Sequence, residues 1–248
     1  MVCALMVFSC SDAQAVVSLA GTRLVFDGRF REATIEVSNP GKARVLIQTW
    51  LADPRAPKGG SAPLPFVVTP HLKQLPAQGK QILRVLYEGV GMPTDRESLL
   101  HLYVLEVPRR SDASQQLSIA IRQRINVFYR PKGLAGNPAN AAEKLSWRWT
   151  SVDHAALGVR NPTPFHVVLH RVAIDDFEVC EDLILEPFSE RSLPVIASSG
   201  DPAKAVRLSF KALTDYGGQR DFCALAQESQ PFNARLRMPG AQLAIGKC

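Results

Sequence analysis

The sequence has 248 residues, which allows one large domain or two of ordinary size with a substantial core. Hydrophobic residues make up 46% and charged residues 21% of the chain, close to globular averages, which excludes a disordered or low-complexity protein. The formal net charge is +6, but Arg109-Arg110 is the only adjacent basic pair, so a solvated surface is favoured over nucleic-acid binding.

The first 15 residues have the pattern of an export signal. They form a short apolar stretch that ends in Ala13-Gln14-Ala15, the small-x-small sequence that signal peptidase reads. Cleavage after Ala15 removes Cys3 and Cys10 and predicts an exported protein. A lipoprotein acylated at Cys10 is the alternative, although Phe8 stands where a small residue is preferred. No apolar run in the sequence reaches about 18 residues, so no stable membrane insertion is expected.

Short apolar segments of period two, separated by turn residues, predict an all-β protein. Thr34–Val37 leads through Asn39-Pro40-Gly41 into Val45–Leu51, which predicts a strand pair. Asp53–Pro65 carries four prolines and two glycines and is expected to be a loop. Further strands are expected at residues 66–69, 81–87, 99–107 and 116–130.

Pro131–Asn140 is the best linker candidate, because it is rich in Gly, Pro and Asn. Beyond it, strands are expected at residues 145–149, 155–159, 165–174, 191–195 and 205–213. Two domains of about 100 to 115 residues follow, the size of an immunoglobulin-type sandwich. The predicted organisation is a signal peptide at 1–15, an N-terminal domain at 16–131, a linker at 132–144 and a C-terminal domain at 145–248.

The sequence contains no set of residues that supports an enzyme. Gly-x-Ser-x-Gly, P-loop, His-Glu-x-x-His and Cys-x-x-Cys motifs are all missing. His166 and His170 lie on one face of an expected strand, but about 13 Å apart, too far to share a metal, so we expect exposed histidines. The acidic residues between 175 and 182 lack the spacing of a calcium loop and are expected in a solvated turn. We predict no catalytic residues, no metal and no cofactor.

Three cysteines remain after signal cleavage, at Cys180, Cys223 and Cys248. One disulfide can form within the chain and leaves one thiol over. Cys223 can pair with either of the other two, and the sequence does not decide between them.

The segment 116–130 is the most unusual of the expected strands. One face carries Leu117, Ile119, Ile121, Ile125 and Val127, and the other is mostly polar. At 15 residues, it is about three times the usual strand length, so part of it is expected to overhang the core. An aliphatic overhang at a sheet edge favours aggregation unless another chain pairs with it, which makes this segment a candidate for binding by β-augmentation.

Eight motifs in order resemble the PapD-like family of periplasmic chaperones of chaperone/usher pilus assembly. They are Gly21–Phe26, Val45–Trp50, Phe66–Pro70, Asp95–Leu99, Arg124–Pro131, Ala141–Leu145, Asn161–Pro164 and Asp215–Gly217. The resemblance covers essentially the whole mature sequence. It implies two immunoglobulin-like β-sandwich domains in a boomerang arrangement.

The resemblance also implies a function. A chaperone of this kind binds and stabilises pilin subunits in the periplasm by donor-strand complementation, and delivers them to an outer-membrane usher. When free, such a protein can cap its donor strands as a dimer. An exported structural or adhesive β-sandwich subunit of a surface fibre is the alternative from a different class.

Several site residues follow from the resemblance alone. Leu117, Ile119 and Ile121 correspond to the side chains that the donor strand inserts into a pilin groove. Arg23 corresponds to the arginine that anchors the pilin C-terminal carboxylate, a task that suits a permanently charged, forked guanidinium. The family's second cation, a lysine, is replaced by Asn126, so carboxylate binding would depend on Arg23 with help from Arg124.

Two further features complete the comparison with the family. Glu97, Arg130 and Asp215 correspond to a buried charge network between the domains. The loop Arg109–Gln115 before the donor strand is short, and resembles the subclass that assembles rod-like or adhesin-tipped pili.

Overall fold

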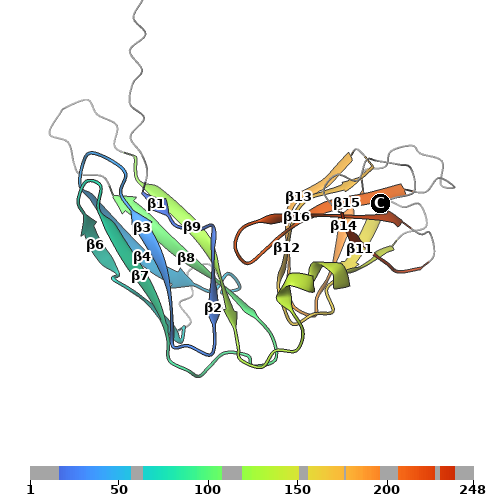
Figure 1. Ribbon diagram of the computed structural model, residues 1–248, viewed down its shortest axis with the longest axis horizontal. Coiled ribbons are helices and arrows are strands. Elements are labelled where there is room, and N and C mark those ends of the chain that lie inside the picture. Colours follow the sequence, from blue (N-terminus) through green and yellow to red (C-terminus); the bar gives the residue numbers. More distant parts are fainter. Residues whose placement is uncertain are drawn as a thin grey trace, which may run out of the picture.

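The computed structural model describes residues 17–56, 64–107, 119–150, 156–175, 177–195, 206–226 and 230–237. Within these ranges the protein consists of β-strands in four sheets, with two short 3₁₀ helices. Figure 1 shows two sandwiches set at an angle, as the two arms of a boomerang. The all-β fold and the boomerang arrangement predicted from the sequence are thereby confirmed. The predicted signal peptide lies outside the described residues.

The N-terminal sandwich contains two antiparallel-dominated sheets. Its strands are β1 (Ser18–Leu19), β2 (Arg23–Asp27), β3 (Glu32–Ser38), β4 (Val45–Ala52), β5 (Phe66–Thr69), β6 (Leu72–Leu75), β7 (Lys80–Tyr87), β8 (Ser98–Val107) and β9 (Ile121–Arg130). The sheet orders are β1-β3-β7-β5 and β2-β9-β8-β4-β6. Alternating side chains of both sheets meet in a core that includes the fully buried Phe26, Ile47, Leu83 and Val127.

The prediction that residues 34–37 and 45–51 form a strand pair is wrong, because β3 and β4 lie in different sheets. β3 pairs with β7, whereas β4 pairs with β8. Each strand has one apolar face, and the two faces meet across the core instead of sharing a sheet edge. Asn39 stabilises the corner between them: its buried amide nitrogen donates to the carbonyls of Ala43 and Pro76, both at 2.8 Å.

The C-terminal sandwich repeats this architecture. Its strands are β10 (Ser146–Trp149), β11 (Ala156–Arg160), β12 (Val167–Ile174), β13 (Phe177–Leu185), β14 (Glu190–Pro194), β15 (Val206–Leu213), β16 (Gln219–Ala226), β17 (Phe232–Asn233) and β18 (Arg235–Leu236). The sheet orders are β14-β11-β10-β17 and β13-β12-β15-β16-β18. Trp147, Leu157, Leu169 and Phe222 are among the most buried side chains of its core.

The second corner uses the same residue type as the first. The amide nitrogen of Asn161 donates to the carbonyls of Phe165 at 2.8 Å and Glu186 at 2.9 Å, and its oxygen accepts from Thr163. The acidic segment after residue 174 is not only a solvated turn, as predicted: Glu178, Glu181 and Asp182 belong to strand β13. That strand was missed because its apolar residues are interrupted by acidic ones.

The predicted linker contains the only helices of the described ranges, η1 (Pro138–Asn140) and η2 (Ala142–Lys144). Asn137 caps η1 by accepting a hydrogen bond from the Ala139 N–H at 3.0 Å, and Pro138 begins the helix. Ala141 and Ala142 are buried in the C-terminal core. The second half of the linker is therefore packed on the C-terminal sandwich. No helix of the described residues is long and apolar enough to cross a membrane.

Candidate functional site

Three polar side chains form one row across the sheet that contains β9. Arg23 on β2 is the direct neighbour of Asn126 in the parallel β2–β9 ladder, and His101 on β8 is the neighbour of Asn126 on the other side. Two and four residues further along the same face of β9, Phe128 and Arg130 contact the C-terminal domain. This face of β9 is therefore the surface of the N-terminal domain that points toward the C-terminal domain.

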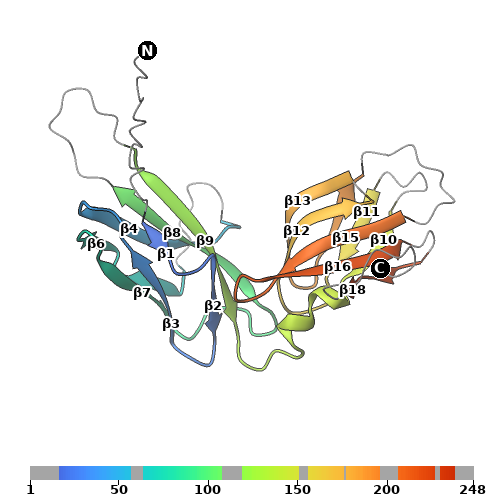
Figure 2. The ribbon, with the colours of Figure 1, turned by 45° about the horizontal axis from the view of Figure 1, so that its top comes forward.

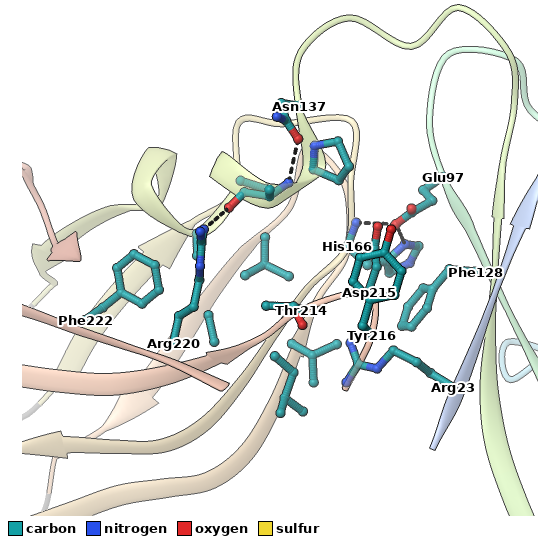
Figure 3. A pocket seen from close by; sticks show the side chains of 18 residues that line it. Arg23, Glu97, Phe128, Asn137, His166, Thr214, Asp215, Tyr216, Arg220 and Phe222 are labelled. Atoms are coloured by element: carbon teal, nitrogen blue, oxygen red, sulfur yellow. Dashed lines mark hydrogen bonds and ion pairs between the residues drawn. The ribbon is translucent and has the colours of Figure 1, made fainter. Parts of the chain in front are cut away.

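A cavity of about 410 Å³ lies between the domains at this surface. The N-terminal domain contributes Arg23, Glu97 and Phe128, and the linker and the β15–β16 region form the opposite side. Figure 3 shows Arg23 and Phe128 extending from the N-terminal strands toward the turn that carries Asp215 and Tyr216.

Arg23 is the most unusual charged group at this cavity. Its Nε is buried and has no hydrogen-bond partner in the described part of the chain, and its guanidinium carbon lies 5.8 Å from the centroid of the Phe128 ring. Burial lowers the pKa of Arg23, while the negative charges of Asp215 and Glu97 act in the opposite direction. A buried polar group usually has a partner, so the unpaired Nε makes Arg23 an exception among the buried polar groups of this domain.

The three residues of the predicted charge network are brought together across the domain boundary. Arg130 donates from Nε to Glu97 at 2.8 Å and, through Nη1 and Nη2, to both oxygens of Asp215 at 2.8 and 3.1 Å. Glu97 is only 2% exposed and Asp215 is 36% exposed. Burial acts to lower the pKa of Arg130, but the hydrogen bonds and charges of both carboxylates outweigh it, and the pKa is raised.

His166 is a further member of this network, and the expectation that it is an exposed strand residue is wrong. It precedes β12, its side chain is 4% exposed, and its backbone N–H donates to Glu97 Oε2 at 2.8 Å. Its Nδ1 lies 3.2 Å from the same oxygen, and its ring packs beside Phe128. His170 lies instead on β12, with Nδ1 at 2.8 Å from Asp182. The position of His166 directly after Asn161–Phe165 is the signal that could have identified it.

Two more contacts join the domains beside Glu97. The Glu97 N–H donates to the Pro164 carbonyl at 2.9 Å. The Arg96 guanidinium lies 5.2 Å from the centroid of the Phe188 ring, in the loop between β13 and β14. None of these contacts was predicted, because each joins loops far apart in the sequence.

The N-terminal half of β9 has an open edge. β8 pairs with β9 from Ile121 onward, but on the other side β2 covers only Asn126–Arg130. No other described strand pairs with residues 121–125 on that side. The predicted apolar face runs out of the core here: Val127 is fully buried and Ile121 is half-buried, whereas Ile119 is 64% exposed. Leu117 and the loop 109–115 lie outside the described residues.

Arg124 is exposed on the same strand face as Asn126, but it does not line the interdomain cavity. It acts on His101 instead: burial, followed by the charge of Arg124, lowers the pKa of His101, and Asp53 opposes the shift. The structure thus places Arg23 and Asn126 together, with Arg124 further along the strand.

The structure decides part of the disulfide pairing. Cys180 is a free thiol and Cys223 is disulfide-bonded, so the pairing of Cys180 with Cys223 is excluded. Cys248 lies outside the described residues. Within the described ranges, no group of three or more His, Cys, Asp or Glu side chains could hold a metal ion.

Comparisons with known proteins cover both domains. Residues 16–135 match the family model described as "Pili and flagellar-assembly chaperone, PapD N-terminal domain", and residues 140–224 match "Pili assembly chaperone PapD, C-terminal domain". Relatives include the probable fimbrial chaperone YadV of Escherichia coli strain K12, 34% identical over 86% of this chain and 90% of that protein. The chaperone protein FimB/FhaD of Bordetella pertussis is 34% identical over 83% of this chain and 86% of that protein.

Solved structures give the same result. The crystal structure of the YadV chaperone matches 84% of this chain and 98% of its own, with a TM-score of 0.68 and 31% identity. A structure of the Salmonella enterica SafA pilin in complex with the SafB chaperone matches 92% of this chain and 99% of that one, with a TM-score of 0.71 and 28% identity. The chain therefore belongs to the PapD family of pilus-assembly chaperones, whose role is not enzymatic.

Proposed function

We propose that this protein binds pilin subunits in the periplasm by lending them a strand, and delivers them to an outer-membrane usher. Family membership and the SafB–SafA complex support a pilin as the partner. The observation that carries the proposal is the combination of an open strand edge on β9 with an arginine that lacks an acceptor at the end of the same sheet.

The open edge supplies both affinity and register. Backbone groups of residues 121–125 that face away from β8 are free to pair with a pilin strand. Leu117, Ile119 and Ile121 would then enter a groove of the pilin. Each aliphatic side chain removed from water contributes about 1.5 to 3 kcal/mol, and the period of two along the strand sets the register.

Arg23 would fix the position of the client strand by binding its C-terminal carboxylate. A C-terminal carboxylate of the client would accept hydrogen bonds from the accessible part of the Arg23 guanidinium. Asn126, its neighbour in the ladder, has an amide that can donate a further hydrogen bond but contributes no charge.

The network around Arg130 holds the two walls of the site at a fixed angle. Arg130 comes from the N-terminal domain and Asp215 from the C-terminal domain, so the ion pair between them closes only at one relative orientation. His166 holds the second oxygen of Glu97 from the C-terminal side. We infer that this network keeps the cavity accessible to a client.

Without a client, two molecules of this protein are expected to pair with each other through the open edges of their β9 strands. Dimers that pair through β9 would bury Ile119 and Ile121, which a single copy leaves in contact with water. Sedimentation of the purified protein tests this: monomers or dimers agree with a chaperone, whereas long polymers would support the alternative of a fibre subunit.

Co-expression with the cognate pilin tests the proposed function. Wild-type protein should give a one-to-one complex in the periplasmic fraction, and Arg23→Ala should lose the complex while keeping the wild-type unfolding temperature. Arg84→Ala is the matched control, because Arg84 lies on β7 in the other sheet and pairs with Glu32 on the surface. A complex retained by Arg23→Ala would overturn the anchoring role, and no complex with the wild type would overturn the function.

A further inference from the structure

Tyr216 lies at the tip of the turn between β15 and β16, and is 99% exposed. Figure 2 shows this hairpin reaching from the C-terminal sandwich toward β2 and β9. In the described part of the chain, Tyr216 has neither a hydrogen-bond partner nor a ring contact. Its side chain therefore contributes almost nothing to the stability of the free protein.

The backbone that carries this ring is nevertheless held firmly. Thr214 N–H donates to the Gly218 carbonyl at 2.8 Å, and Gly217 N–H donates to the Thr214 carbonyl at 3.0 Å. Asp215, the residue before Tyr216, accepts two hydrogen bonds from Arg130 of the other domain. The turn is thus fixed on the N-terminal domain immediately beside an unpartnered aromatic side chain.

Gly217 allows the turn to come close to the N-terminal domain. Its φ of +80° is a conformation that favours glycine, and a Cβ at this position would lie 3.4 Å from the Thr22 hydroxyl oxygen. Thr22 directly precedes Arg23. The turn therefore places Tyr216 beside the residue for which the carboxylate role is proposed.

Tyr216 lines the same cavity as Arg23 and Phe128. Figure 3 shows its ring on the C-terminal side of the cavity, with Phe128 and Arg23 on the N-terminal side. Tyrosine is enriched among the residues that dominate binding energy at interfaces, and a rigid backbone reduces the entropy that is lost when a partner binds. An exposed ring on a fixed turn has both properties.

We propose that Tyr216 is a client-binding residue whose ring packs on the C-terminal residue of the pilin while Arg23 holds that residue's carboxylate. The inference rests on the proposed function and deepens it. The terminal residue of the client then lies between Arg23 of one domain and Tyr216 of the other. The ion pair between Arg130 and Asp215 then has a second role, because it positions Tyr216 for the client.

The experiment measures binding of a peptide with the C-terminal sequence of the cognate pilin and a free carboxylate, by titration calorimetry. Tyr216→Ala should weaken binding roughly tenfold, as expected for the loss of an interface aromatic, and should leave the unfolding temperature unchanged. Tyr216→Phe should bind like the wild type. Phe177→Ala is the control, since Phe177 is another exposed aromatic, on β13 of the same domain.

The outcomes separate this inference from the proposed function. If Tyr216→Ala binds the peptide within twofold of the wild type while Arg23→Ala does not bind, the role of Tyr216 is wrong and the chaperone function stands. A lowered unfolding temperature of Tyr216→Ala would also contradict the inference, because the ring would then support the fold. If the wild type binds neither the peptide nor the intact pilin, the proposed function itself is wrong.

Discussion

Arg23 and Asn126 are direct neighbours in the parallel ladder of β2 and β9. Arg23 is half-buried, and its Nε has no partner in the described residues, whereas Asn126 carries no charge. The site proposed for a carboxylate therefore contains one permanent cation and one neutral donor. Its selectivity for a chain end depends on Arg23.

A lysine at Asn126 should strengthen the site. Asn126→Lys would place a second cation beside Arg23, so binding of the pilin C-terminal peptide should be unchanged or several-fold tighter. The free protein should lose about 0.2 to 1 kcal/mol of stability, because like charges on neighbouring strands repel. Calorimetry and urea unfolding measure the two effects. Asn126→Met is the uncharged control of similar length, and a large loss of binding in Asn126→Lys would mean that Asn126 has its own specific role.

The two carboxylates around Arg130 should differ in their effect on stability. Glu97→Gln removes a carboxylate that is only 2% exposed from its charged hydrogen bond with Arg130, and should cost about 1.5 to 3 kcal/mol. Asp215→Asn removes a more exposed partner and should cost about 0 to 1 kcal/mol. Urea unfolding gives both values, with Glu32→Gln as the surface control. Equal costs for the two variants would contradict the burial argument.

Domain orientation gives a second readout of the same network. Both Glu97→Gln and Asp215→Asn should widen the distribution of interdomain angles, which small-angle X-ray scattering detects as an increased radius of gyration. Glu32→Gln should not change the scattering curve. Unchanged scattering in the Asp215 variant would show that other contacts, such as Arg96 with Phe188, hold the angle.

The exposed end of the β9 face should matter for binding and not for folding. Ile119→Ser should leave the free energy of unfolding unchanged and raise the Kd for the pilin by about one to two orders of magnitude, the value of one aliphatic anchor. Ile82→Ser is the control, because Ile82 is another exposed isoleucine, on β7 of the opposite sheet. A Kd for Ile119→Ser equal to that of the control would remove Ile119 from the binding strand.

Stability should depend on pH through His101. Its folded-state pKa is lowered by burial and by Arg124, so the unfolded chain binds the proton more readily. This contribution to stability is complete above the unfolded pKa of about 6.5 and is lost as the pH falls toward the folded-state pKa. His101→Gln should therefore show a shallower decrease in unfolding free energy between about pH 6.5 and 5 than the exposed-residue control His71→Gln. Identical slopes for the two variants would contradict the assignment.

The sequence predicted most strands but not how they pair. Alternation in 34–37 and 45–51 shows that each strand has one buried face, yet it is equally compatible with a hairpin and with a crossing between sheets, and the hairpin prediction was wrong. The parallel pairing of β2 with β9, which sets Arg23 beside Asn126, joins segments about 100 residues apart and leaves no local signal.

The site shows the same limit. Only the resemblance to a family predicted the network of Glu97, Arg130 and Asp215. Glu97 and Arg130 are 33 residues apart in the sequence, and Arg130 and Asp215 are 85 apart, so no local pattern connects them. His166 was misassigned because its strand begins one residue later, at Val167, so the period of the strand does not describe its environment. Tyr216 belongs to the Asp215–Gly217 motif, but its exposure is visible only in the structure.

Amide hydrogen exchange of β9 distinguishes strand donation from every other way of binding a client. Backbone amides of residues 121–125 that point away from β8 should exchange rapidly in monomeric protein and become strongly protected when the pilin binds, while amides paired with β8 change little. If the complex forms and these amides exchange as fast as before, the client does not add a strand to β9, and the account of binding by strand donation is wrong.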